Sequence, residues 1–134
     1  MTAIAKSAMT KSLVNIMVIA AIGAALSVPA QAQTGATAAD YVVRKTSDVR
    51  IKMGISAFKD GDYERAASYN LKALKAGLSK SRKAIAYNNL CAALGAQGDY
   101  AGAVEACDSA LELRPDLKEA VQNRAAVQAQ LSGQ

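Results

Sequence analysis

Apolar residues recur with the period of an α-helix over most of the chain from residue 46 onward. Apolar side chains recur every three to four positions, which places them on one face of a helix. Short breaks rich in Gly, Asp, Ser or Pro separate these stretches. Strand signals are nearly absent, and only residues 41–44, Tyr-Val-Val-Arg, have an extended pattern. The pattern predicts an all-α protein.

The breaks divide this region into five predicted helices. Their expected limits, in chain order, are Ser47 or Asp48 to Gly61, Tyr63 to Gly77, Ser79 or Ser81 to Gly98, Asp99 to Pro115, and Pro115 or Asp116 onward. The apolar stripe expected along the first helix consists of Val49, Met53, Ala57 and Phe58. Ile51 and Ile55 lie off that stripe.

The start of the chain has a different pattern. Two lysines precede an apolar run over residues 13–28, and small residues follow it. This layout is typical of a cleavable secretory signal, and the run is short for a membrane-spanning helix, which needs about 20 apolar residues. We expect cleavage after Ala32, with Ala30 as the second choice, and no stable membrane insertion afterwards. The expected location is the bacterial periplasm, an oxidising compartment.

One phrase of the sequence occurs twice. Residues 59–74 read KDGDYERAASYNLKAL and residues 96–111 read AQGDYAGAVEACDSAL, with Gly-Asp-Tyr and Ala-Leu in the same places. The two copies are 37 residues apart. A recurrence of this length, built from two short helices, indicates a helical solenoid in which each hairpin covers its neighbour.

The second copy belongs to a segment, residues 87–115, that resembles a tetratricopeptide repeat. The matching positions are Tyr87, Leu90, Tyr100, Ala103, Ala110 and Pro115. An earlier unit matches through Met53, Gly54, Gly61, Tyr63, Ala66, Ala73 and Leu74, with Arg50 and Leu78 where the family has an aromatic residue and a proline. The resemblance implies a short right-handed solenoid of two helix-turn-helix units and a capping helix. The expected segments are a signal peptide (1–32), a flexible linker (33–46), unit 1 (47–83), unit 2 (84–117) and a capping helix with its tail (118–134).

Small residues and a cysteine pair bear on how the hairpins pack. Small side chains let two helix axes approach closely, and the expected crossing points are Gly54, Ala66, Ala73, Ala103 and Ala110. Cys91 precedes the Gly98 turn by seven residues and Cys107 follows it by nine, so the two should face each other across the hairpin. In an oxidising compartment they would form a disulfide. The alternative is that both are small buried hydrophobic residues.

Composition restricts the chemistry. The chain contains no histidine and no glycine-rich phosphate loop, so we expect no catalytic residue, no cofactor, no metal site and no enzymatic activity. Residues 40–83 contain eleven basic and five acidic residues, whereas residues 84–134 contain three basic and six acidic. A basic region can attract nucleic acid, but no nucleic-acid-binding motif accompanies this one, and we expect no such partner.

In the family that the chain resembles, the first helix of each unit lines a concave groove that holds an extended peptide or a partner helix. The corresponding residues here are Ile51, Ile55, Phe58, Lys59, Asn88, Asn89, Ala92, Gln122 and Asn123. Asn side chains can hold a peptide backbone because each offers two donors and an acceptor. Exposed Ile51, Ile55 and Phe58 would add apolar contacts. The expected function is therefore a non-enzymatic periplasmic adaptor that binds a protein or peptide segment.

Three alternatives stay open at this point. The Asn88-Asn89 pair can reflect the ordinary composition of such repeats. Ile51 and Ile55 can pack against residues 41–44 folded back over them, which would close the groove. The uneven charge also permits a structural self-assembling protein of the cell envelope, in which the basic first unit of one copy docks head-to-tail on the acidic C-terminal half of the next.

Overall fold

The computed structural model of the protein describes residues 37–134, and these residues are helical, with no strand among them. A short 3-10 helix, η1 (Ala38–Asp40), precedes five α-helices. These are α1 (Val49–Lys59), α2 (Tyr63–Lys75), α3 (Lys80–Gln97), α4 (Tyr100–Leu113) and α5 (Lys118–Ser132). The prediction of an all-α repeat protein is confirmed. The predicted signal peptide lies outside the described residues.

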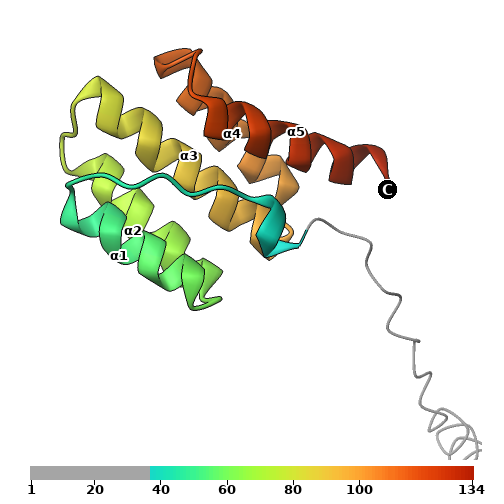
Figure 1. The fold of residues 1–134 in the computed structure, drawn as a ribbon, viewed down its shortest axis with the longest axis horizontal. Helices are drawn as coiled ribbons and strands as arrows, with labels where there is room; N and C mark the ends of the chain where they lie inside the picture. The colour runs from blue at the N-terminus through green and yellow to red at the C-terminus, as the bar shows by residue number, and fades with distance from the viewer. Residues whose placement is uncertain (1–36) are drawn as a thin grey trace, which may run out of the picture. The chain divides into compact units, whose positions relative to one another are not determined.

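Consecutive helices form hairpins, α1 with α2 and α3 with α4, and α5 packs against the second hairpin (Figure 1). Helix α3 is central, because it contacts α1, α2, α4 and α5. Within residues 37–134, no helix combines the length and the apolar character that crossing a membrane requires.

Both hairpins turn through the same local structure. Gly61 and Gly98 adopt positive φ angles of 80° and 85°, a backbone conformation that favours glycine. The next residue, Asp62 or Asp99, caps the following helix by accepting a hydrogen bond from the backbone N–H three positions later, at 3.0 Å in both cases. The repeated Gly-Asp-Tyr phrase therefore encodes one turn and one helix start, used twice.

Small residues lie at the helix crossings, as predicted. A Cβ atom added to Gly54 would lie 2.7 Å from Nδ2 of Asn70 and 3.3 Å from the carbonyl oxygen of Ala66, so α1 and α2 touch at this point. The predicted alanines Ala66, Ala73, Ala103 and Ala110 are each at most 1% exposed. A larger side chain at these positions would push the helix axes apart.

The buried face of α1 differs from the predicted stripe. Val49 and Met53 are 63% and 43% exposed, whereas Ile51 is fully buried and Ile55 nearly so. Helix α1 is the outermost helix of the stack, so one of its sides has no neighbour among the described residues. The two isoleucines instead face α3 and the segment that precedes α1, in a shared apolar cluster. Ala57 and Phe58, the other two members of the predicted stripe, are buried.

The predicted flexible linker, residues 33–46, contains an ordered segment. Residues 41–44, which we call the strap, run in an extended conformation from η1 across α3 towards the start of α1 (Figure 1). Tyr41 is only 5% exposed, and side chains from α3 and α5 hydrogen-bond the backbone of the strap. The expectation of flexibility is therefore wrong for these residues, because contacts with distant helices fix them.

Candidate functional site

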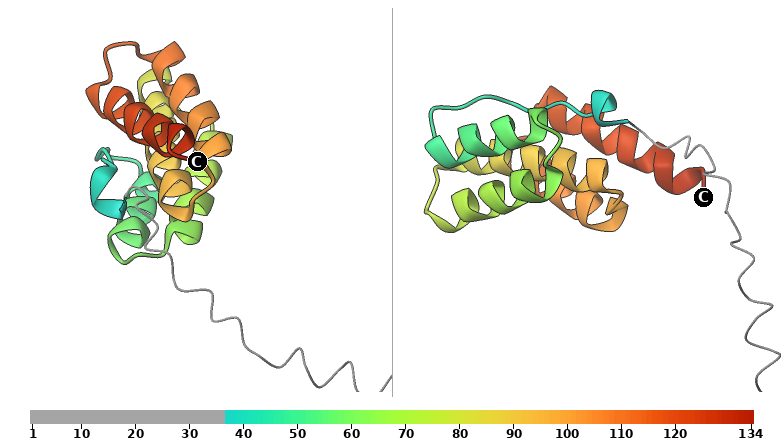
Figure 2. Two further views of the ribbon diagram at one scale, coloured as in Figure 1. Left: turned by 90° about the vertical axis from the view of Figure 1, so that its right-hand side faces the viewer. Right: turned by 90° about the horizontal axis from the view of Figure 1, so that it is seen from below.

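The predicted groove residues lie where the strap meets the first helices of the repeat units. Figure 2 shows the strap along the side of the molecule on which α1 and α5 lie. The groove residues that the structure buries are Ile51, Ile55, Phe58, Asn88, Asn89, Ala92 and Asn123. Lys59 and Gln122 are exposed. The expectation that Ile51, Ile55 and Phe58 are exposed is wrong, because the fold covers them, and the groove of the isolated chain is occupied by the chain itself.

Asn123 and Asn89 hold the strap through its backbone. The Oδ1 atom of Asn123 accepts a hydrogen bond from the N–H of Val42 at 2.7 Å, and its Nδ2 donates to the carbonyl of the same residue at 2.8 Å. Asn89 does the same for Arg44, at 2.7 Å and 3.0 Å. Each asparagine therefore satisfies both backbone groups of one residue, and the two residues are two positions apart in an extended segment.

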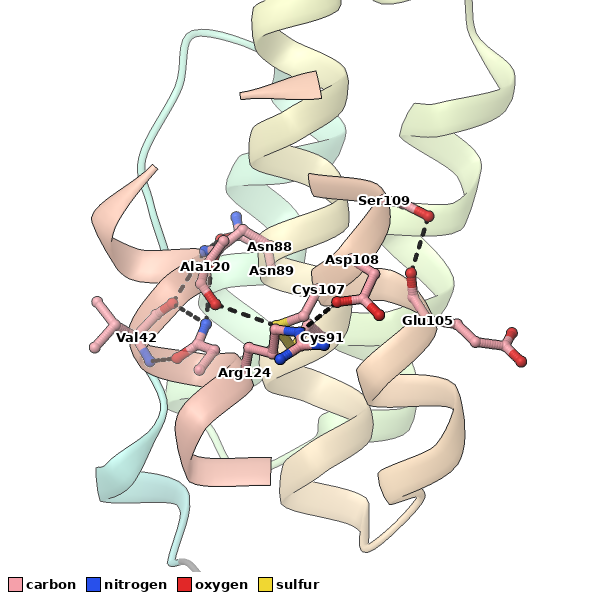
Figure 3. Close-up of a disulfide and its surroundings, with 11 residues drawn as sticks. Val42, Asn88, Asn89, Cys91, Glu105, Cys107, Asp108, Ser109, Ala120 and Arg124 are labelled. Carbon is pink, nitrogen blue, oxygen red and sulfur yellow. Dashed lines mark hydrogen bonds and ion pairs between the residues drawn. A yellow bond between two sulfur atoms is a disulfide. The ribbon is translucent and has the colours of Figure 1, made fainter. Parts of the chain in front are cut away.

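Asn88 connects these two clamps. Its Nδ2 group donates to the carbonyl of Val42 and to Oδ1 of Asn89, both at 3.1 Å, and its Oδ1 accepts from Nδ2 of Asn123 at 3.0 Å. All three asparagines are at most 1% exposed. Buried amides are costly unless they are paired, so this network holds its members in one arrangement. Figure 3 shows Asn88 and Asn89 beside Val42.

Tyr41 anchors the start of the strap against α3. A Cβ atom added to Gly95 would lie 2.6 Å from Cζ of Tyr41, so the ring packs directly on the helix backbone. Burial, together with the nearby Tyr100 and Asp40, raises the pKa of Tyr41 to about 12. The hydroxyl group is buried and has no hydrogen-bond partner among residues 37–134. The aromatic ring therefore supplies apolar contact at this position.

The rest of the strap adds one apolar and one charged contact. Val43 packs against two apolar clusters, one of which contains Ile51 and Ile55 of α1. The guanidinium of Arg44 pairs with the carboxylate of Glu119 at the start of α5, at 2.7 Å. These contacts join α1, α3 and α5 through four consecutive residues.

A hollow continues the groove beyond the strap. It has a volume of about 510 Å³ and lies between the residues that follow the strap and α1. Its lining consists of Lys45, Thr46, Lys52, Ile55, Ser56 and Lys59. The exposed Lys59, which the sequence placed in the groove, therefore belongs to a basic extension of it.

Cys91 and Cys107 form a disulfide across the α3–α4 hairpin, the pairing expected from their distances to the turn. Their Cα atoms are 5.2 Å apart. The sulfur of Cys107 lies 3.5 Å from the carbonyl oxygen of Ala120, so α5 packs on the bond itself (Figure 3). Asp108 of α4 pairs with Arg124 of α5 on the same side. The disulfide thus braces the helix that carries Asn88 and Asn89 against the elements that position Asn123.

Sequence reasoning found the asparagines, and its open alternative that residues 41–44 fold back over Ile51 and Ile55 is confirmed by Val43, but it did not connect the asparagines with that segment. The strap residues Tyr41, Val42 and Arg44 were assigned to a linker, and Glu119 had no predicted role. Gly95 was also missed, although a glycine inside a helix costs about 1 kcal/mol relative to alanine and often marks a close approach. That glycine, together with the one extended segment in an all-helical chain, was the available signal.

The arrangement is suited to binding rather than to bond-breaking chemistry. Its polar groups are amides that pair with a peptide backbone, and its charged groups form ion pairs. No cluster of His, Cys, Asp or Glu suited to a metal ion occurs within residues 37–134.

Comparisons with known proteins identify the second hairpin. The tetratricopeptide repeat family model matches residues 84–117, which contain α3, α4, the disulfide and two of the three clamping asparagines. No curated protein and no solved structure matches the chain. Residues 84–117 therefore match one tetratricopeptide repeat, and the all-helical hairpin architecture is consistent with a short repeat of this kind.

Proposed function

We propose that this protein is a non-enzymatic adaptor that holds an extended segment of a partner protein in the groove formed by α1, α3 and α5. Tetratricopeptide repeats mediate protein–protein interactions, so a protein partner follows from the family. The use of this groove is supported by one observation. Its buried asparagines already pair with both backbone groups of two residues in an extended segment.

A partner segment would take the place of the strap. The strap connects to α1 only through residues 45–48, so its departure breaks no helix. Because Asn89 and Asn123 pair with backbone groups, they accept any segment that presents an N–H and a carbonyl at the right spacing. Release of the strap leaves these amides unpaired, which favours occupation by another backbone.

Capture from a periplasmic extract tests the groove. The full oxidised chain, immobilised, is compared with its Tyr41→Ala variant, in which the strap loses its anchor. We expect Tyr41→Ala to capture more of the same partners, and the double variant Tyr41→Ala/Asn123→Ala to lose them. Gln122→Ala is the matched control, because Gln122 is the exposed neighbour of Asn123 and its side chain forms no hydrogen bond with a described residue. Equal capture with Asn123→Ala and Gln122→Ala in the Tyr41→Ala background would exclude groove binding.

The periplasm is the proposed location. The signal-like pattern of residues 1–32 supports it, and so does a disulfide, since disulfides persist in oxidising compartments. Protein purified from the periplasmic fraction should begin at Gln33, or at Gln31 if cleavage follows Ala30. An intact N-terminus in a cytoplasmic fraction, with both thiols free to alkylation, would contradict this location.

Self-association is the second candidate function, and the distribution of exposed apolar residues favours it. Of the five large apolar side chains that are exposed among residues 37–134, Val49 and Met53 lie on α1, and Val121 and Leu131 lie on α5. These helices are the two ends of the stack. A hollow of about 980 Å³ between α4 and α5 includes Val121 and Glu112 in its lining, together with Asp108 and its partner Arg124. Residues 84–134 contain six acidic and three basic residues, opposite in net charge to the lysine-rich first unit.

Light scattering across a salt series tests this second function. A head-to-tail contact between the basic end and the acidic end would strengthen at low salt and could continue into filaments. Met53→Glu should abolish the association. Leu71, the remaining one of the five exposed large apolar residues, lies on α2, and Leu71→Glu should leave the association intact. A strictly monomeric chain at low salt would exclude it.

A further inference from the structure

We infer that the strap is a ligand carried by the chain itself, and that the partner segment has the same pattern: an aromatic residue, any residue but proline, an apolar residue and a basic residue. This inference rests on the groove being the binding site proposed above. It adds the chemistry by which the groove selects its occupant.

The backbone sets the register. The N–H and carbonyl groups of Val42 pair with Asn123 and Asn88, and those of Arg44 pair with Asn89. The N–H of Val43, between them, donates to no described residue. The groove therefore reads alternate residues of an extended segment, which matches the two-residue period of such a backbone. Proline is excluded at the two clamped positions because it lacks the N–H.

Side chains set the selectivity at the other positions. The ring of Tyr41 fits against the bare backbone of Gly95, a space that any side chain on α3 would fill. Val43 faces the apolar clusters that include Ile51 and Ile55. Arg44 meets Glu119 at 2.7 Å. The side chain of Val42 belongs to none of the apolar clusters, so the second position of the pattern is open.

The strap is an imperfect occupant of its own groove. The Tyr41 hydroxyl and the Oε2 atom of Glu119 are buried, and neither has a hydrogen-bond partner in the described part of the chain. Only one oxygen of Glu119 is used by Arg44, although an arginine can pair with both oxygens of a carboxylate. A partner segment that forms a hydrogen bond with either atom would make more favourable contacts with the groove than the strap does. This difference is what allows exchange despite the high local concentration of a tethered segment, of the order of millimolar for short linkers.

A peptide of the strap sequence tests the inference. A labelled peptide of residues 37–48, TAADYVVRKTSD, is titrated with the full oxidised chain and followed by fluorescence anisotropy. We expect it to bind the Tyr41→Ala chain about tenfold or more tighter than the unmodified chain, since a tethered competitor lowers the apparent affinity by the fraction of grooves it fills. Arg44→Glu in the chain is a second way to loosen the strap and should act in the same direction. Circular dichroism verifies that both variants stay helical.

Modified peptides test the register and the selectivity. N-methylation at Val42 or Arg44 should weaken binding about tenfold. Each methyl group removes one buried hydrogen bond, and such a bond changes the dissociation constant by about a factor of ten. N-methylation at Val43 is the matched control and should have little effect. A peptide with Glu in place of Arg44 should bind poorly to the Tyr41→Ala chain and recover when the chain also carries Glu119→Arg.

The outcomes separate this inference from the proposed function. If the peptide fails to bind the Tyr41→Ala and Arg44→Glu chains while Tyr41→Ala still captures partners through Asn123, the pattern is wrong and the groove function stands. If neither peptide nor partner depends on Asn123, both are wrong. Equal effects of N-methylation at Val42, Val43 and Arg44 would overturn the alternate-residue register, and failure of the Glu119→Arg rescue would overturn the basic position.

Discussion

The two hairpins of this protein share a turn but differ in what holds them together. Gly61 and Gly98 have nearly the same φ angle, and Asp62 and Asp99 cap the next helix at the same distance. Yet a disulfide joins α3 to α4, whereas α1 and α2 are held by packing alone, with a close approach at Gly54. The repeated phrase fixes the shape of a hairpin, and residues that differ between the two hairpins, above all Cys91 and Cys107, decide how each hairpin is stabilised.

The surroundings of the hairpins differ as well. The α3–α4 hairpin lies between α2 on one side and α5 on the other, and the strap covers α3. The α1–α2 hairpin forms the end of the stack and leaves Val49, Met53 and Leu71 exposed. Its attachment to the rest of the chain consists of α3 and the strap. We therefore expect the second hairpin to tolerate loss of the strap better than the first.

Removal of the disulfide should have the largest effect on the free energy of unfolding, and it would remove the main difference between the two hairpins. The Cys91→Ala/Cys107→Ala variant opens a loop of 16 residues, for which the chain-entropy model gives a loss of about 3 kcal/mol in the free energy of unfolding. Urea unfolding under oxidising conditions measures this loss, and reduction of the unmodified chain should reproduce it. A loss below about 1 kcal/mol would mean that packing alone holds both hairpins alike.

Gly95→Ala tests how the strap attaches to the second hairpin. The added methyl group would collide with the Tyr41 ring, and overpacking of this kind costs about 1–3 kcal/mol. In the Tyr41→Ala background the same substitution should stabilise by up to about 1 kcal/mol, because alanine favours a helix over glycine. A double-mutant cycle of unfolding free energies measures this reversal of sign. If the sign does not reverse, the Tyr41 ring is not the reason for a glycine at position 95.

The two turn caps should respond alike, which sharpens the comparison. Asp62→Ala and Asp99→Ala each remove one N-cap hydrogen bond and should each cost about 1 kcal/mol of unfolding free energy. Asp60→Ala is the control, since the Asp60 side chain forms no hydrogen bond with a described residue. Asp62 also pairs with the exposed Arg65, which adds little. A clear excess for Asp62 would show that the turns are not equivalent.

At neutral pH, ionisation of Tyr41 should have the smallest effect, because the phenol is neutral in both the folded and the unfolded chain. Its pKa is raised from 10.0 to about 12 by burial, so the folded state favours the neutral phenol. The stability that the neutral phenol gives the folded state is fully present below pH 10. It is lost as the pH rises from 10 towards 12, because the phenol ionises at a lower pH in the unfolded chain than in the folded one. Tyrosinate absorbance should show one late-titrating tyrosine, absent from Tyr41→Phe. The same variant should be as stable as the original at neutral pH, because the hydroxyl it removes has no partner.

Local sequence patterns were sufficient for the features that depend on neighbouring residues. The Gly-Asp-Tyr phrase predicts both turns because positive φ angles and helix caps are set within a few positions. The facing cysteines follow from their similar distances, seven and nine residues, to one turn. The small residues at the crossings follow from helix geometry, since a repeat of two helices has fixed points of closest approach.

The features that depend on distant residues could not be predicted in this way. Which side of α1 is exposed depends on which side its neighbours bury. The buried side is the one that packs against Val43 and α3. The spacing of Val49 and Met53 is as helical as that of Ile51 and Ile55, so periodicity alone does not choose between them. The order of the strap comes from Asn89 and Asn123, 45 and 81 positions away from their backbone partners.

The long reach of the hydrogen bond between Val42 and Asn123 has a consequence for the newborn chain. The ribosome makes the strap before it makes α5, and 81 positions separate the two bonded residues. Until α5 has folded, Asn123 cannot hold the strap, and contacts between such remote positions are slow to form. A partner segment that arrives in this interval competes with a strap that Asn123 does not yet hold, so the order of folding favours the partner.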